Sequence, residues 1–125
     1  MKYVLDTHPL VFLIYKPANL SKKAVKIIQN DSNILYIPTI ALLEIKYLFE
    51  IEKIKGRISD VIHYIKQKTN IYIIGFNEDE LQEALLLKST RDPFDRIILA
   101  TAMSMEIHII TKDQWMRKTY SKTIW

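Results

Sequence analysis

The chain has no cysteine among its 125 residues and only two glycines. Without cysteine it forms neither a disulfide framework nor a thiolate zinc site, and it has no cysteine nucleophile. Hydrophobic residues make up 49% of the sequence, a share that argues against a disordered chain. No apolar run is long enough to cross a membrane, and the opening MKYVLD is too short for a signal peptide. We therefore expect a soluble, cytoplasmic protein with a single domain over residues 1–125.

The net charge, the histidines and the aromatic residues say less about the function of the protein. Lysine and arginine total 18 against 14 acids, a formal net charge of +4 at pH 7. A basic surface favours a polyanionic partner, nucleic acid first, but a lysine-rich composition without functional meaning explains the balance equally well. The histidines show no short metal-ligand spacing and are expected to be structural; they are His8, His63 and His108. The aromatic residues are spread through apolar runs, so we expect them in the core and predict no RNA-stacking surface.

Short apolar runs alternate with helical patterns along the chain. The β-prone runs predict strands over residues 3–5, 34–37, 71–74 and 107–110, with a short edge strand over 123–125. Helical periodicity predicts helices over residues 8–15, 21–30, 39–50, 57–68, 77–88 and from 93 onward. Strands separated by one or two helices are typical of a parallel sheet covered on both faces. We therefore expect an α/β fold, a three-layer α/β/α sandwich around a mostly parallel sheet of four to five strands.

The segment RDPFDRIILATA, residues 91–102, joins two carboxylates and a proline to an apolar helical run. Asp92 fits the N-cap of a helix, and Pro93 fits its first position, where a missing N–H costs nothing. Asp95 falls one turn further on, at the head of the apolar stripe. Asp95 therefore either completes a capping box with Asp92 or directs a charge into a site.

Three further acids stand where strand ends would bring them together. Asp6 ends the first predicted strand, Asp113 follows the fourth, and Glu44 lies on an apolar face of the helix after the second. Because sites in parallel sheets lie beyond the carboxyl ends of the strands, we expect these acids and Asp95 to converge on one rim. A buried carboxylate without a partner is costly, so Glu44 favours a functional site, with a salt bridge to a buried arginine as the structural alternative. Asp6 and Asp113 would serve equally well as turn formers or helix caps.

Clustered carboxylates without cysteine or paired histidines prefer hard cations, Mg²⁺ or Mn²⁺. Without a cation such acids repel one another, and some of them keep their protons. A cation in this setting activates water and neutralises charge on a phosphate, which phosphodiester hydrolysis requires. The four acids therefore favour a metal-dependent phosphodiester hydrolase.

Four motifs occur in order along the chain: Asp6-Thr7 after an opening strand, Glu44 within an apolar helix, DPFDRIILATA, and IITKD. Together they resemble the PIN domain and, more narrowly, the VapC-type toxins of prokaryotic toxin–antitoxin pairs. The resemblance covers the whole chain and implies one PIN domain with endoribonuclease activity toward RNA. It implies Asp6, Glu44, Asp95 and Asp113 as catalytic ligands of Mg²⁺ or Mn²⁺. It also implies a homodimer or higher homo-oligomer, and inhibition by an antitoxin protein that covers the site.

The resemblance gives supporting roles to three more residues. Asp92 matches a second aspartate common in this subgroup, which is expected to cap the helix or support the ligands from behind. Thr7 and Thr111 match small hydroxyl positions that orient the acids or their waters. Thr90 stands where members of the subgroup often carry a histidine, which removes the basis for assigning this loop a substrate role.

Other classes of function compete with the endoribonuclease. A non-catalytic PIN-like module would bind RNA or an antitoxin without cutting, but all four acids are present. A phosphoacceptor protein of receiver type needs an aspartate after the third strand, where this chain has Gly75-Phe76-Asn77. A haloacid-dehalogenase nucleophile expects an acid two residues further on, where His8 stands. The endoribonuclease is therefore the leading hypothesis, and the binding module is its alternative.

Overall fold

The computed structural model describes residues 1–88, 90 and 92–125, and its five strands form one all-parallel sheet in the order β3-β2-β1-β4-β5. The strands are β1 Lys2–Leu5, β2 Ile34–Pro38, β3 Ile71–Ile74, β4 His108–Ile110 and β5 Thr123–Ile124. The α-helices are α1 Thr7–Tyr15, α2 Lys22–Ile28, α3 Thr39–Glu50, α4 Ile58–Lys66, α5 Glu78–Leu86, α6 Pro93–Ser104 and α7 Gln114–Thr119, and a 3₁₀ turn, η1, spans Pro17–Asn19. Arg91, the first residue of the segment RDPFDRIILATA, lies outside the described residues.

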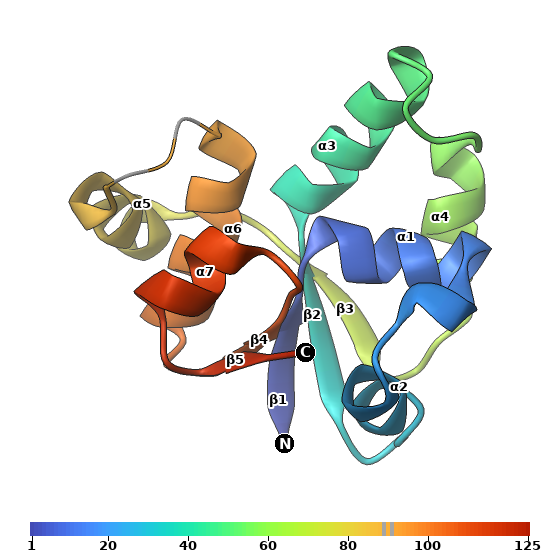
Figure 1. The fold of residues 1–125 in the computed structure, drawn as a ribbon, viewed down its shortest axis with the longest axis horizontal. Helices are drawn as coiled ribbons and strands as arrows, with labels where there is room; N and C mark the ends of the chain where they lie inside the picture. The colour runs from blue at the N-terminus through green and yellow to red at the C-terminus, as the bar shows by residue number, and fades with distance from the viewer. Residues whose placement is uncertain (89, 91) are drawn as a thin grey trace.

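Helices cover both faces of the sheet (Figure 1). Helices α1, α2 and α4 lie on one side and α5, α6 and α7 on the other, while α3 extends beyond the carboxyl ends of the strands and contacts both α1 and α6. The predicted α/β/α sandwich is confirmed, and its sheet is wholly rather than mostly parallel. The chain proceeds from β1 outward to β3 and then returns to β4 on the other side of β1. In open sheets of this kind, ligand sites lie at the point where the strand order reverses, here between β1 and β4.

The central strands are almost entirely apolar because helices cover both of their faces. Val4 and Leu5 of β1, Leu35 and Ile37 of β2, and Ile109 of β4 are fully buried. Within the described part of the chain, no helix is both long and apolar enough to span a membrane. The buried strands therefore form a rigid base from which the loops at their carboxyl ends project.

Helix α6 begins as the sequence predicts. Oδ1 of Asp92 accepts hydrogen bonds from the N–H groups of Phe94 at 2.8 Å and Asp95 at 3.2 Å, and Pro93 occupies the first turn. Ile98, one turn beyond Asp95, is fully buried. The N-cap and the apolar stripe are both confirmed, and together they fix the place of Asp95 at the head of the helix.

Helices α2, α4 and α5 each end two residues before their predicted ends, and α7 was not predicted. Helix α5 stops before Lys88 because Leu87 is extended, with its N–H donating to the carbonyl of Ala84. Helix α7 was not predicted, since its six residues bury only Met116 and so give no periodic apolar pattern. It begins where the carboxylate of Asp113 accepts a hydrogen bond from the N–H of Met116 at 2.8 Å.

Candidate functional site

Five acids line one cavity of about 370 Å³ at the carboxyl edge of the sheet; they are Asp6, Glu44, Asp92, Asp95 and Asp113. They come from the ends of β1 and β4 and from the first turns or faces of α3 and α6, far apart in the sequence. The structure therefore brings together all four acids that the sequence singled out and adds Asp92 to them.

The carboxylate of Asp6 is hydrogen-bonded through both of its oxygens. Oδ1 accepts from the N–H of Thr7 at 2.7 Å, and Oδ2 accepts from the hydroxyl of Thr111, also at 2.7 Å. The same hydroxyl accepts from the N–H of Asp113 at 3.0 Å. Burial raises the pKa of Asp6, and the bonds from Thr111 and Thr7 act against that rise. Thr111 thus has the contact expected of a residue that orients an acid.

Glu44 is a buried carboxylate, with only 7% of its surface exposed. Within the described residues its Oε1 has no hydrogen-bond partner, and no salt bridge to an arginine is present there. Burial, with repulsion from Asp6, Asp92 and Asp113, raises the pKa of Glu44 to about 7. The Thr7 hydroxyl lowers this pKa by its proximity, although no hydrogen bond of ordinary geometry joins the two side chains. Glu44 therefore needs either a proton or a cation.

The ionised form of Asp95 is disfavoured for the same reasons as that of Glu44. Burial comes first, followed by repulsion from the other four acids of the cavity, and together they raise the pKa of Asp95 to about 8. Glu44, Asp92 and Asp95 each offer an oxygen within 4.8 Å of the others. Asp92 therefore caps α6 through Oδ1 and also belongs to the tightest group of acids, a position that the sequence alone did not assign to it.

Three of the acids occupy helix N-caps. Asp6 caps α1, Asp92 caps α6 and Asp113 caps α7, so three helix N-termini meet at the cavity. The positive ends of these helices offset part of the repulsion between the carboxylates. The capping alternative for Asp6 and Asp113 is confirmed, and it is compatible with a place in the site because each carboxylate still borders the cavity.

Other side chains complete the lining of the cavity, and no motif in the sequence pointed to them. His8 is exposed and lines the cavity, and its proximity lowers the pKa of Asp6; its expected structural role stays a prediction. Lys112 places its Nζ 4.9 Å from the ring centre of Phe12. Trp115 donates its indole N–H to the carbonyl of Lys88 at 3.0 Å. Trp115 belongs to α7, whose pattern is too short to be recognised from the sequence.

The donor set fits a hard divalent cation. The tight group offers carboxylate oxygens only, which is the chemistry that Mg²⁺ and Mn²⁺ prefer. Among the described residues, the unpartnered oxygen of Glu44 and the raised pKa values of Glu44 and Asp95 show that the positive charge close to these acids is too small to keep both ionised at neutral pH. A bound cation would supply that charge and displace the protons.

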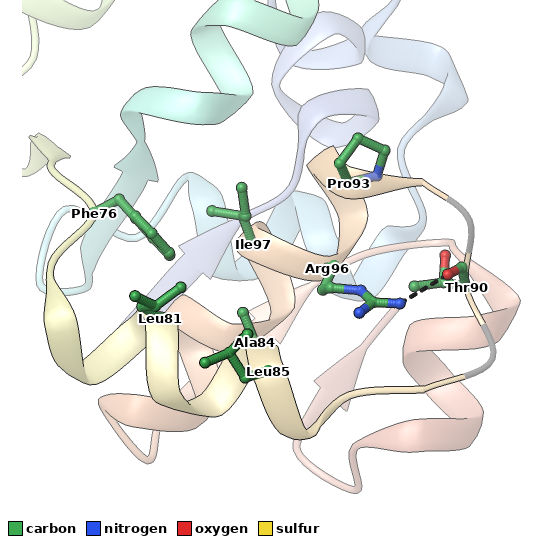
Figure 2. A pocket seen from close by; sticks show the side chains of 8 residues that line it. All are labelled: Phe76, Leu81, Ala84, Leu85, Thr90, Pro93, Arg96 and Ile97. Carbon is green, nitrogen blue, oxygen red and sulfur yellow. Dashed lines mark hydrogen bonds between the residues drawn. The ribbon is translucent and has the colours of Figure 1, made fainter.

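A separate hollow of about 340 Å³ lies between α5 and α6 (Figure 2). Its wall is apolar, with side chains that include Phe76, Leu81 and Leu85. At its edge the guanidinium of Arg96 donates to the carbonyl of Thr90 at 2.9 Å. None of the described residues that line this hollow is acidic, so it offers a cation no carboxylate.

Comparisons relate the chain and its fold to known proteins. Residues 3–122 match the family model of the PIN domain. The chain is 29% identical over 117 residues to Ribonuclease VapC22 of Mycobacterium tuberculosis, covering 91% of this chain and 88% of that protein. Among solved structures, VapBC2 of Rickettsia felis bound to a promoter DNA fragment aligns with a TM-score of 0.71 at 18% identity, over 94% of this chain and 92% of that one. The sarcin-ricin loop cleaving toxin VapC20 of Mycobacterium tuberculosis aligns with a TM-score of 0.68 at 14% identity, over 94% of each chain. The family match spans nearly the whole chain, and it therefore shows that the chain belongs to the PIN domain family.

Proposed function

We propose that this protein is a metal-dependent endoribonuclease that hydrolyses RNA phosphodiester bonds at the acidic cavity. The observation that carries the proposal is the convergence of five acids on one cavity of a PIN domain, three of them with oxygens within 4.8 Å of one another. The names of the relatives support it, since one is called a ribonuclease and another a sarcin-ricin loop cleaving toxin. The proposed role is that of the toxin in a toxin–antitoxin pair.

Asp6, Glu44, Asp95 and Asp113 are the proposed ligands of Mg²⁺ or Mn²⁺, with Asp92 beside them. When bound, such an ion neutralises charge on the phosphate and lowers the pKa of water. The side chains around it have their own tasks. Thr111 and the N–H of Thr7 keep the carboxylate of Asp6 in one orientation.

A lysine at the rim suits a phosphodiester chain. Lys112 lines the cavity beside the acids, so the backbone of an RNA that approaches the acids meets a cation at the entrance, and the His8 ring lies there too. Phosphate contacts of this kind supply affinity without reading sequence. The rim therefore attracts the substrate that the carboxylates alone would repel.

An antitoxin protein and a second copy of the chain are the proposed partners. The resemblance to VapC-type toxins implies both, and the VapBC2 structure of Rickettsia felis shares the fold. Exposed apolar side chains around the hollow between α5 and α6 support self-association, because Leu81 and Leu85 of α5 are 43% and 71% exposed (Figure 2).

The test is RNA cleavage by the purified chain with Mg²⁺, with Mn²⁺ and with a chelator. Cleavage should require the cation, and Asp6→Asn and Asp95→Asn should each reduce it about a hundredfold or more. Asp31→Asn, at an exposed aspartate outside the cavity, is the matched control and should cut RNA like the parent. Undiminished cleavage in both cavity variants would contradict the proposal, and RNA binding without any cleavage would favour the binding module.

A further inference from the structure

Two aromatic side chains lie side by side at the edge of the acidic cavity. Tyr47 of α3 and Phe94 of α6 have ring centroids 6.3 Å apart and ring planes inclined by 24°. Tyr47 is 48% exposed and Phe94 is half-buried. The expectation that the aromatic residues all belong to the core is wrong here, because α3 and α6 meet at the rim and leave these rings on its outer side.

The helical turns that carry the acids also carry the two rings. Tyr47 follows Glu44 by three residues, which places both on the same side of α3. Phe94 stands between Asp92 and Asp95 in the first turn of α6. The rings and the carboxylates are therefore fixed relative to one another by the same backbone.

The two rings open onto a hollow that adjoins the acidic cavity. Tyr47, Phe94 and Lys53 line this hollow of about 540 Å³, and Glu44 and Asp92 line both it and the acidic cavity. Its volume falls within the roughly 300–1,000 Å³ typical of small-molecule sites. A ligand that crossed the edge formed by Glu44 and Asp92 would touch aromatic rings on one side and acids on the other.

One lysine, Lys53, borders this hollow, and two more line the hollow next to it. Lys53 also lines a neighbouring hollow, to which Lys16 and Lys55 contribute. His8 lines both that neighbouring hollow and the acidic cavity. Rings for a base and cations for phosphates therefore stand next to the carboxylates, which is the combination found in sites for single-stranded nucleic acid.

We infer that Tyr47 and Phe94 stack an unpaired base of the RNA beside the phosphodiester that enters the acidic cavity, while Lys53 contacts the backbone. The inference rests on the proposed function and names the form of substrate that it takes. Inside a continuous duplex a base is stacked between its neighbours and offers no free face to a ring. The site therefore selects single-stranded segments, such as loops or unstructured stretches.

A competing use of Tyr47 is contact with a second copy of the chain. Leu43, one turn before Tyr47 on α3, and Ile51, the C-cap residue of α3, are also exposed, at 57% and 42%. The joined hollow, the paired ring and the adjacent lysine favour RNA, because apolar contact with another chain requires none of them. The experiment separates the two uses.

RNA binding is measured by fluorescence anisotropy with Mg²⁺ present, in an Asp6→Asn background that should slow cleavage about a hundredfold or more. The probes are a labelled single-stranded oligoribonucleotide and the same oligonucleotide annealed to its complement. Tyr47→Ala and Phe94→Ala should each weaken single-strand binding about tenfold or more, the usual effect of losing one stacked base. Tyr47→Phe keeps the ring and should bind within about twofold of the parent. Tyr72→Ala is the matched control, since Tyr72 is 49% exposed and lines neither hollow.

Unchanged affinity in Tyr47→Ala, or equal affinity of the parent for single strand and duplex, would overturn the inference. So would a lower mass of Tyr47→Ala by sedimentation with no loss of RNA affinity per chain, because the face would then be a contact between copies. RNA cleavage is also measured with chains that keep Asp6, with and without Tyr47→Ala. This assay distinguishes failure of the stacking inference from failure of the proposed function. A chain that cuts RNA regardless of Tyr47 keeps the proposed function without the stacking, and a chain that binds as expected without cutting keeps the stacking alone.

Discussion

Thr111 connects two acids of the cavity through one hydroxyl group. It donates to Oδ2 of Asp6 and accepts from the N–H of Asp113, at 2.7 and 3.0 Å. The side chain is fully buried, so neither bond competes with bulk water. Thr111 therefore couples the end of β4 to the acid at the end of β1.

Replacement of Thr111 by valine should keep the shape of the side chain and remove both bonds. We expect a loss of about 1–3 kcal/mol of stability from the unpaired groups and a fall in RNA cleavage of about 10–100-fold, the usual cost of removing a group that orients a metal ligand. Urea unfolding and the cleavage assay measure the two effects. Thr101→Val is the control, since Thr101 is buried in α6 and its hydroxyl donates to the carbonyl of Ile97 at 2.9 Å, outside the acidic cavity. Full cleavage by Thr111→Val would show that Asp6 needs no such support.

The raised pKa values of Glu44 and Asp95 make the metal-free protein sensitive to pH. Their carboxyl groups hold protons in the folded chain up to about pH 7 and 8, whereas the unfolded chain loses them near the ordinary values of 4.5 and 3.8. Between those limits the folded state binds more protons, so its stability falls as the pH rises.

In a chelator, the Tm should therefore drop by several degrees between about pH 5 and pH 9. Thermal melts monitored by tryptophan fluorescence test this, and addition of Mn²⁺ should remove most of the dependence by replacing the protons. The double variant Glu44→Gln, Asp95→Asn should show a flatter profile. A Tm that rises across this range would contradict the raised pKa values.

Individual residues differed in how far the sequence revealed them. Asp6, Glu44, Asp95 and Asp113 could be predicted to converge because each follows or faces a strand end in a parallel sheet. The exposure of Tyr47 could not be predicted, because most of its neighbours in the sequence are apolar. Its place at the rim depends on the contact between α3 and α6, which only the structure reveals. His8 gave no ligand spacing, and its position at the cavity depends on the direction in which α1 leaves β1.

At the scale of elements, helix caps determine where the acids point. Asp6, Asp92 and Asp113 each fix the start of a helix at the cavity. The N-caps of α1 and α6 follow from sequence, because a strand end or a proline marks the position. The N-cap of α7 does not follow from the sequence, because this helix is short and has no periodic apolar pattern.

Asp92 offers a way to separate capping from a role in the cavity. Asparagine caps helices as well as aspartate, whereas alanine does not. Asp92→Ala should lose about 1 kcal/mol of stability. Asp92→Asn should keep its stability in a chelator or gain some, because the repulsion that Asp92 exerts on Glu44 and Asp95 disappears. Urea unfolding of the two variants checks this, and equal destabilisation of both would show that the charge itself stabilises the helix.

At the scale of the whole molecule, the topology accounts for the site. Reversal of strand order between β1 and β4 opens a crevice, and the loops that leave these strands carry Asp6 and Asp113 into it. This architecture could be predicted from the alternation of strands and helices alone. The exposed apolar face of α5 could not be predicted from the sequence. An acidic amphipathic pattern does not reveal that Leu85 stays exposed after folding.

Self-association through the face formed by Leu81 and Leu85 predicts a change in mass. Leu85→Glu places a charge on a side chain that is 71% exposed, so the fold should persist while the assembly dissociates. Sedimentation equilibrium should show a smaller mass than for the parent chain. Gln82→Glu adds the same charge at another exposed position of α5 and should leave the mass unchanged. An assembly that survives Leu85→Glu would place the contact elsewhere.

The most direct test of the acidic cavity is a calorimetric titration of the purified protein with Mn²⁺ near pH 7. Because Glu44 and Asp95 have pKa values of about 7 and 8, uptake of the ion should release protons, and the heat should vary with the ionisation enthalpy of the buffer. We predict saturable uptake with proton release, and a marked loss of affinity in Asp95→Asn but not in Asp31→Asn. Absence of saturable uptake, or equal uptake by the parent and Asp95→Asn, would contradict the assignment of this cavity as a metal centre.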